Sequence, residues 1–151
     1  MIDLAKGIQF PTFVPYGKAT LELYVSGCSR DCFGCHNPEL RKFKDMTADD
    51  TQELMKKLLT RRDFFDIISI SGGDLLCHPE EKALEFVNSL KSNFPEKDFW
   101  LFTGEDHIEN VPQWAKETFS CIKIGHFDEK LKQPGFPASS NQKLLKKGKD
   151  Y

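Results

Sequence analysis

Three cysteines lie within eight residues near the start of the chain, at Cys28, Cys32 and Cys35. Thiolates are soft ligands, so three of them in one loop suit an iron-sulfur cluster or zinc. Three ligands leave one iron of a four-iron cluster open, and an open metal position is where substrate binds when a metal site does chemistry. From spacing alone, a disulfide or a structural zinc site completed by a distant residue also fits these cysteines.

A second polar turn, Ser71-Gly72-Gly73-Asp74, follows an apolar run. Glycines let a backbone approach a ligand closely, and their exposed carbonyl groups can meet an ammonium group. Asp74 adds an acceptor of suitable charge. The alternative is a plain strand-to-helix turn.

The cysteine spacing, with Gly27 before it and Gly-Cys-His-Asn (residues 34–37) closing it, resembles the radical S-adenosylmethionine (SAM) enzymes. Within that superfamily it is similar to the small activases of glycyl-radical enzymes, in particular those of the anaerobic ribonucleoside-triphosphate reductase. Ile-Lys-Ile-Gly at residues 122–125 and Ser-Ser-Asn-Gln at residues 139–142 support the narrower resemblance. Together the matches span about Gly27 to Gln142.

This resemblance implies a set of roles for the matching residues. Cys28, Cys32 and Cys35 are expected to hold a [4Fe-4S] cluster whose fourth iron binds SAM. One electron from the cluster would cleave SAM to methionine and a 5'-deoxyadenosyl radical, which would take hydrogen from a glycine of the reductase. The turn formed by Gly72, Gly73 and Asp74 is expected to contact the amino group of SAM. The family usually continues with proline, where this chain has Leu75.

Two further loop residues are candidates for the cofactor site. The activases resembled here place a ring after the third cysteine, so His36 is expected near the adenine of SAM; an exposed loop histidine is the alternative. Asn37 is expected to bond within the loop or to the ligand. Cys77 or His78 could instead complete a zinc site with the three cysteines, which would make the chain a zinc-binding interaction domain. Cys121 is expected in the core.

The elements that position these motifs are strands alternating with helices. Strands are predicted at residues 20–26, 66–71, 98–102 and 121–125, and helices at 47–62, 79–94 and 113–118. This alternation predicts right-handed βαβ units and a parallel sheet. Each motif follows a strand, at the edge where parallel α/β sheets bind ligands. We therefore predict an α/β fold, an open and incomplete (βα) barrel with a mostly parallel sheet.

Length and composition indicate one radical SAM domain over residues 1–151, with an irregular N-terminal lead-in or edge strand (1–19) and a polar C-terminal tail (134–151). A formal net charge of -2 gives no reason to expect nucleic acid or an anionic membrane as a partner. No apolar stretch reaches the roughly 18 residues of a membrane span, and the N-terminus lacks the apolar region of a signal peptide. The expected location is the cytoplasm.

The partners implied by the resemblance are the large glycyl-radical subunit of the anaerobic reductase and a reductant such as flavodoxin or ferredoxin. Other candidate functions are an activase of the pyruvate formate-lyase type and a radical SAM enzyme acting on a metabolite. Ferredoxin-type electron carriers use four cysteines per cluster in a tighter run than this one.

Overall fold

The computed structural model describes residues 2, 4, 8–13, 15–30, 32, 34, 35 and 38–151. The strands are β1 (Ile8–Thr12), β2 (Thr20–Val25), β3 (Ile67–Gly72), β4 (Asp98–Phe102), β5 (Cys121–Ile124) and β6 (Lys143–Lys146). The α-helices are α1 (Ala48–Thr60), α2 (Glu80–Asn93) and α3 (Gln113–Thr118). The helix and strand boundaries lie within a residue or two of those predicted for the central elements.

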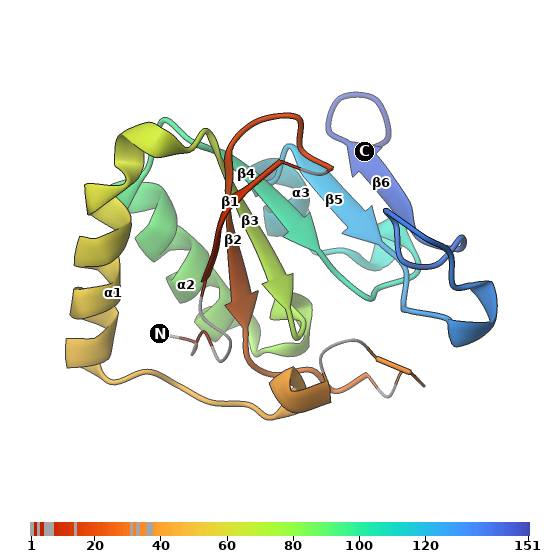
Figure 1. The fold of residues 1–151 in the computed structure, drawn as a ribbon. Coiled ribbons are helices and arrows are strands. Elements are labelled where there is room, and N and C mark those ends of the chain that lie inside the picture. Colours follow the sequence, from red (N-terminus) through yellow and green to blue (C-terminus); the bar gives the residue numbers. More distant parts are fainter. Residues whose placement is uncertain are drawn as a thin grey trace.

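The strands form one six-stranded sheet in the order β1-β2-β3-β4-β5-β6 (Figure 1). The four central strands, β2 to β5, run parallel, while β1 and β6 are antiparallel at the two edges. The register brings Val25 of β2 beside Gly72 of β3. The cysteine loop and the Gly-Gly-Asp turn therefore leave the sheet side by side. The predicted α/β fold with an open, mostly parallel sheet is confirmed.

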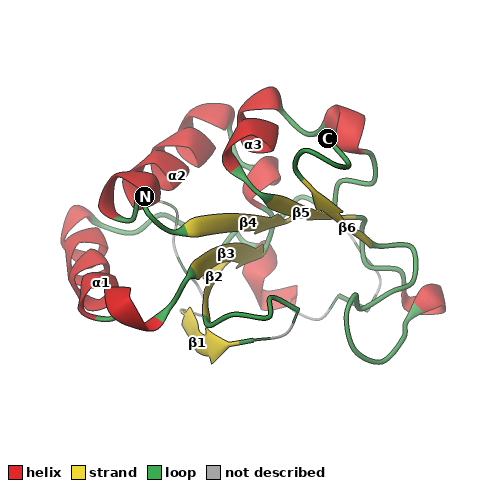
Figure 2. Cartoon of the chain, turned by 90° about the horizontal axis from the view of Figure 1, so that it is seen from above, coloured by secondary structure: helices red, strands yellow, loops and turns green. Residues whose placement is uncertain are grey.

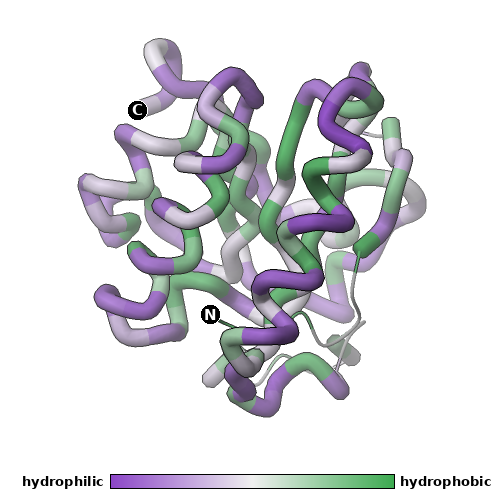
Figure 3. The backbone as a smooth tube through the Cα atoms, turned by 90° about the vertical axis from the view of Figure 1, so that its left-hand side faces the viewer, coloured by the Kyte–Doolittle hydropathy of each residue, from purple (hydrophilic) through white to green (hydrophobic). Residues whose placement is uncertain are grey.

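All three α-helices lie on the outer side of the curved sheet (Figure 2). The sequence of α1 explains its placement, because Met55 and Leu58 recur at helical spacing and are buried. The helix begins after Thr47, whose side chain accepts a hydrogen bond from the backbone N–H of Asp50 at 3.1 Å. Hydrophilic and hydrophobic residues accordingly alternate along the helices (Figure 3).

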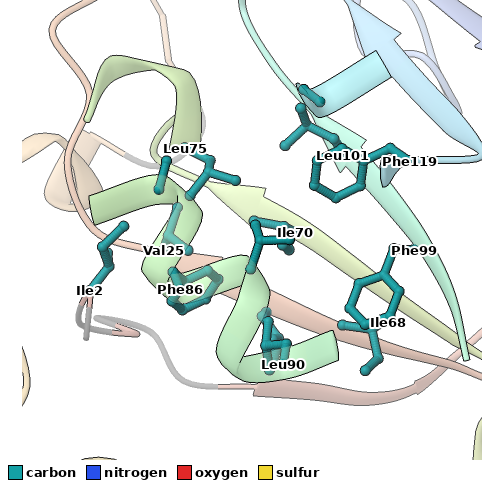
Figure 4. Packing of buried hydrophobic residues seen from close by; sticks show 14 of the residues in the cluster. Ile2, Val25, Ile68, Ile70, Leu75, Phe86, Leu90, Phe99, Leu101 and Phe119 are labelled. Carbon is teal, nitrogen blue, oxygen red and sulfur yellow. The ribbon is translucent and has the colours of Figure 1, made fainter. Parts of the chain in front are cut away.

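The main core fills the layer between the sheet and the helices. Phe86 and Leu90 of α2 pack toward Ile68 and Ile70 of β3 (Figure 4), and all four are fully buried. Leu21, Leu23 and Val25, the alternating apolar residues of β2, belong to the same cluster. This outer face of the sheet is therefore an ordinary hydrophobic core.

The opposite, helix-free face of the sheet is different in character. Because side chains alternate across a strand, it receives the other residues of each strand. They are Glu22 and Tyr24 of β2, Ser69 and Ser71 of β3, Trp100 and Phe102 of β4, and Cys121 and Lys123 of β5. Tyr16, from the loop before β2, packs on it beside Trp100 with ring centroids 4.9 Å apart. This face is mostly polar and aromatic, and Ile67 is buried in a small cluster with Tyr16 and Trp100.

The C-terminal segment has more structure than its sequence indicated, whereas the N-terminal segment takes one of its two expected forms, an edge strand. Strand β6 lies within the predicted polar tail and pairs with β5, although its Lys143 and Lys146 stay exposed as expected for a solvated end. The N-terminal lead-in forms the edge strand β1, with an irregularity between Gln9 and Thr12. No helix in the described part of the chain has the length and apolar character needed to cross a membrane.

Candidate functional site

A cavity of ≈ 170 Å³ lies where the parallel strands end. Its lining combines Cys28, Cys32 and Cys35 with the turn from Ser71 to Asp74, and adds residues that follow β4 and β5. The structure therefore brings the two motifs singled out in the sequence to one site, at the carboxyl edge of the sheet where α/β proteins bind ligands.

The first cysteine is held by the backbone behind the loop. The N–H of Gly27 donates to Leu40 at 2.7 Å and the N–H of Cys28 donates to Arg41 at 3.0 Å. Farther along, the N–H of Cys35 donates to the carbonyl of Cys32 at 3.2 Å. Within the described residues, no three cysteine, histidine or carboxylate side chains lie close enough together to hold a metal ion.

The Gly-Gly-Asp turn packs directly on the base of the cysteine loop. The N–H of Asp74 donates to the carbonyl of Gly27 at 2.8 Å, and the N–H of Gly73 donates to Val25 at 2.8 Å. A Cβ at position 73 would lie 2.5 Å from the carbonyl oxygen of Gly27. Glycine is required there because no side chain fits between the two backbones.

The carboxylate of Asp74 is 1% exposed and accepts hydrogen bonds from four protein groups. The donors are Arg30 Nε at 2.8 Å, Thr103 Oγ1 at 2.9 and 3.0 Å, the N–H of Gly104 at 2.8 Å and the N–H of Leu76 at 3.0 Å. Burial alone would lower the pKa of Arg30, but Asp74 outweighs it and raises that pKa. In this structure the carboxylate of Asp74 links three segments by hydrogen bonds: the cysteine loop, the turn after β3 and the loop after β4. Its expected contact with the amino group of SAM stays a prediction.

Cys77 and His78 occupy the far side of the cysteine loop. A hydrogen bond between the thiols of Cys28 and Cys77 raises the pKa of Cys28 and lowers that of Cys77. His78 is buried, and its Nε2 lies 2.6 Å from the carbonyl oxygen of Ser26. The ring of Phe43 meets His78 edge-on at 4.9 Å. His78 therefore supports the end of β2 from behind.

Lys123 is the lysine of the Ile-Lys-Ile-Gly motif at residues 122–125, for which the sequence suggested no role at the site. Its side chain lines the cavity, and its Nζ lies 5.3 Å from the centre of the Phe102 ring. Burial lowers the pKa of Lys123 to about 8, although the charges of Asp74 and Cys32 act in the opposite direction. A desolvated cation in a ligand cavity can bind a carboxylate strongly, because little water screens the pair.

The Ser-Ser-Asn-Gln stretch at residues 139–142 fastens the loop after β5. Gln142 donates through Nε2 to the carbonyl of Gly125 at 3.0 Å and accepts from the N–H of Ser139 at 3.2 Å. Ser139 Oγ in turn accepts from the N–H of Asp128 at 3.2 Å. Both Ser139 and Gln142 are buried. Because Gln142 lines the cavity, the stretch shapes one wall of it.

Two histidines complete the comparison with the sequence. His36 and Asn37, both expected at the cofactor site, lie outside the described residues. His126 lines the cavity, and its Nδ1 lies 2.7 Å from Oδ1 of Asp106. This pairing was not visible in the sequence, because Asp106 lies 20 residues before His126 and on a different loop.

Comparison with known proteins identifies relatives over most of this chain. Residues 17–145 match a family described as a 4Fe-4S single cluster domain. An anaerobic ribonucleoside-triphosphate reductase-activating protein of Haemophilus influenzae is 38% identical over 143 residues, covering 88% of this chain and 92% of the relative. Proteins of the same description from Escherichia coli and phage T4 are 29% and 34% identical, covering 88% and 81% of this chain and 92% and 80% of the relatives.

Proposed function

This chain belongs to the 4Fe-4S single cluster domain family, alongside anaerobic ribonucleoside-triphosphate reductase-activating proteins, and we propose that it forms a glycyl radical on such a reductase. The observation that carries the proposal is the shared cavity. Three cysteine thiols, a glycine-rich turn and a buried lysine line one space at the ligand-binding edge of the sheet. A structural zinc site would need no such cavity beside it.

The donor set fits an iron-sulfur cluster with one open position. Cys28, Cys32 and Cys35 supply three soft ligands from one loop. When bound, the cluster would supply the single electron that splits SAM into methionine and a 5'-deoxyadenosyl radical, which becomes 5'-deoxyadenosine by taking hydrogen from a glycine Cα.

The remaining residues of the cavity bind and orient SAM in this proposal. The backbone carbonyls of Gly72 and Gly73 can accept hydrogen bonds from its amino group. Lys123 pairs with its carboxylate. On the strength of the sequence resemblance, His36 is proposed near the adenine, and Asn37 is proposed to bond within the loop or to the ligand.

The proposed partners are the glycyl-radical subunit of the anaerobic reductase and a one-electron donor of the flavodoxin or ferredoxin type. The activating role of the relatives supports the first partner. A reductant is needed because each SAM cleavage consumes one electron. No α-helix of the described residues covers the other face of the sheet, which leaves that face open to a polypeptide (Figure 2).

The first experiment measures the cluster and its open position. Protein purified without oxygen and reduced by dithionite should give the EPR signal of a reduced [4Fe-4S] cluster, and that signal should change when SAM is added. A colourless protein that holds stoichiometric zinc and takes up no iron would contradict the proposal and favour a zinc-binding domain.

The second experiment identifies the substrate. The reduced protein, SAM and the anaerobic reductase should give the EPR doublet of a glycyl radical, with 5'-deoxyadenosine as co-product. Pyruvate formate-lyase serves as the control substrate and should acquire no radical. A radical on pyruvate formate-lyase alone would move the assignment to an activase of that type.

A further inference from the structure

A polar row crosses the helix-free face of the sheet just below the cavity. Glu22 of β2 lies beside Gln9 of β1 on one side and Ser69 of β3 on the other. The next row toward the cavity pairs Tyr24 with Ser71, and Ser71 lines the cavity. Rows on one face are two residues apart, about 6.6 Å. Glu22 is therefore one row away from the proposed reaction site.

Glu22 is a half-buried carboxylate without a cation beside it in the described part of the chain. Burial raises its pKa, and the hydroxyls of Tyr24, Tyr16 and Ser71 lower it; no lysine or arginine is among the groups that act on it. Carboxylates that are removed from water are normally paired with a cation or fully hydrogen-bonded. Glu22 has a stabilising hydroxyl environment but lacks the opposite charge.

The hydroxyls around Glu22 do not saturate it. Each hydroxyl has one proton to donate, whereas an ionised carboxylate has about four acceptor positions. The hydroxyls of Tyr24, Tyr16 and Ser71 hydrogen-bond to Glu22 and so fill about three of these positions. Glu22 therefore keeps acceptor capacity on the concave side of the sheet.

Lys123 is the lysine of this face that lines the cavity, and it lies across the sheet from Glu22. Lys123 belongs to β5, which is separated from β2 by β3 and β4, so the two strands lie about 14 Å apart at roughly 4.8 Å per strand. The charges that act on Lys123 are those of Asp74 and Cys32, not of Glu22. The helix-free face thus carries a positive charge at the cavity, from Lys123, and a negative charge on the side of β2, from Glu22.

We propose that Glu22 is a subsite for a cationic side chain, an arginine or a lysine, on the polypeptide loop that carries the target glycine. The inference rests on the proposed function, because it takes the substrate to be a polypeptide lying across the concave face. An extended chain advances about 3.3 Å per residue, so the cation belongs about two residues from the glycine. A guanidinium would suit the site well, since it can donate two parallel hydrogen bonds to one carboxylate.

The test compares Glu22→Gln with a matched control, Glu53→Gln. The first change removes the charge and keeps the size of the side chain; Glu53 is exposed on α1, on the other side of the sheet. Glycyl-radical EPR intensity is measured against reductase concentration, and the Kd for SAM is measured without reductase. The reductase concentration for half-maximal radical formation should rise about tenfold for Glu22→Gln and stay unchanged for Glu53→Gln.

A charge exchange gives a second, independent readout. Glu22→Lys should weaken the response to the natural reductase further, and a reductase whose cationic residue near the glycine is changed to glutamate should restore it. A Glu22→Gln curve that superimposes on that of the wild type would overturn the subsite. An equal rise in the Kd for SAM would overturn it too, because Glu22 would then serve the cofactor. If wild-type protein cleaves SAM but forms no glycyl radical on the reductase, the proposed function fails, and the subsite with it.

Discussion

Arg30 Nε donates a hydrogen bond to Oδ2 of Asp74 at 2.8 Å, which joins the cysteine loop to the turn after β3. Asp74 is 1% exposed and Arg30 29% exposed. Asp74→Asn should lower the free energy of unfolding by about 2–4 kcal/mol, because it removes a buried charge partner and turns an amide N–H₂ toward hydrogen-bond donors. Urea unfolding of the reduced protein without cluster measures the loss.

Arg30→Gln is the matched variant on the other side of this pair. It removes one donor from Asp74 and leaves those of Thr103, Gly104 and Leu76 in place. The expected loss is smaller, about 1–2 kcal/mol. A larger loss for Arg30→Gln than for Asp74→Asn would contradict the view that Asp74 is the centre of the network.

Lys123 gives SAM binding a dependence on pH. Its pKa is about 8 because burial disfavours the charged form, and only that form attracts a carboxylate. The Kd for SAM should therefore rise as the pH increases through about 8, by up to tenfold per pH unit. Equilibrium dialysis across this range measures the effect.

Lys123→Met is expected to bind SAM about tenfold more weakly at neutral pH. The ligand's own titration is common to both proteins, so the difference between the two pH curves isolates the lysine. Lys143→Met, on the exposed edge of β6, is the control and should follow the wild-type curve. Parallel curves for wild type and Lys123→Met would show that Lys123 does not face the carboxylate.

The central strands and helices were predictable because their sequences carry local signals. Alternating Leu21, Leu23 and Val25 predicted β2, and the spacing of Met55 and Leu58 with the cap at Thr47 predicted α1. Parallel order then followed from the alternation of strands and helices. Strand β6 had no such signal, because its two inner residues are both leucine and its outer residues both lysine. Only its pairing with β5 makes it a strand.

The sequence predicted which motifs line the cavity but not the residues that support them. The cysteines and the Gly-Gly-Asp turn are contiguous motifs, so their spacing is visible in the sequence. Asp74 instead meets Arg30 and Thr103 across 44 and 29 residues. The role of Lys123 depends on which face of β5 it occupies. Such relationships follow from the strand register, which the sequence did not specify.

The hydrogen bond from Gln142 Nε2 to the carbonyl of Gly125 should contribute to the stability of the fold and to ligand binding. Gln142→Ala leaves the buried carbonyl of Gly125 and the N–H of Ser139 without their partners, so the free energy of unfolding should fall by about 1–3 kcal/mol. The loop that carries His126 would also loosen, and the Kd for SAM should rise. Thermal unfolding and equilibrium dialysis measure the two effects.

Ser140→Ala provides the control for this stretch, because Ser140 is exposed between buried Ser139 and half-buried Asn141. Its effect on unfolding should stay within about 0.5 kcal/mol. Equal effects of Gln142→Ala and Ser140→Ala would mean that the buried hydrogen bonds of Gln142 contribute little.

Cysteine variants separate the proposed cluster ligands from the other two thiols. Changing Cys28, Cys32 or Cys35 singly to alanine should abolish reductive SAM cleavage and lower the iron bound after anaerobic reconstitution, because each removes one of three ligands. Cys121→Ser, whose thiol is 7% exposed in β5, should keep full iron content. Cys77→Ser should also keep it, since Cys77 contacts Cys28 without belonging to the ligand set. Iron retained at the wild-type level by Cys32→Ala or Cys35→Ala, or lost by Cys77→Ser alone, would mean that a different set of thiols holds the metal.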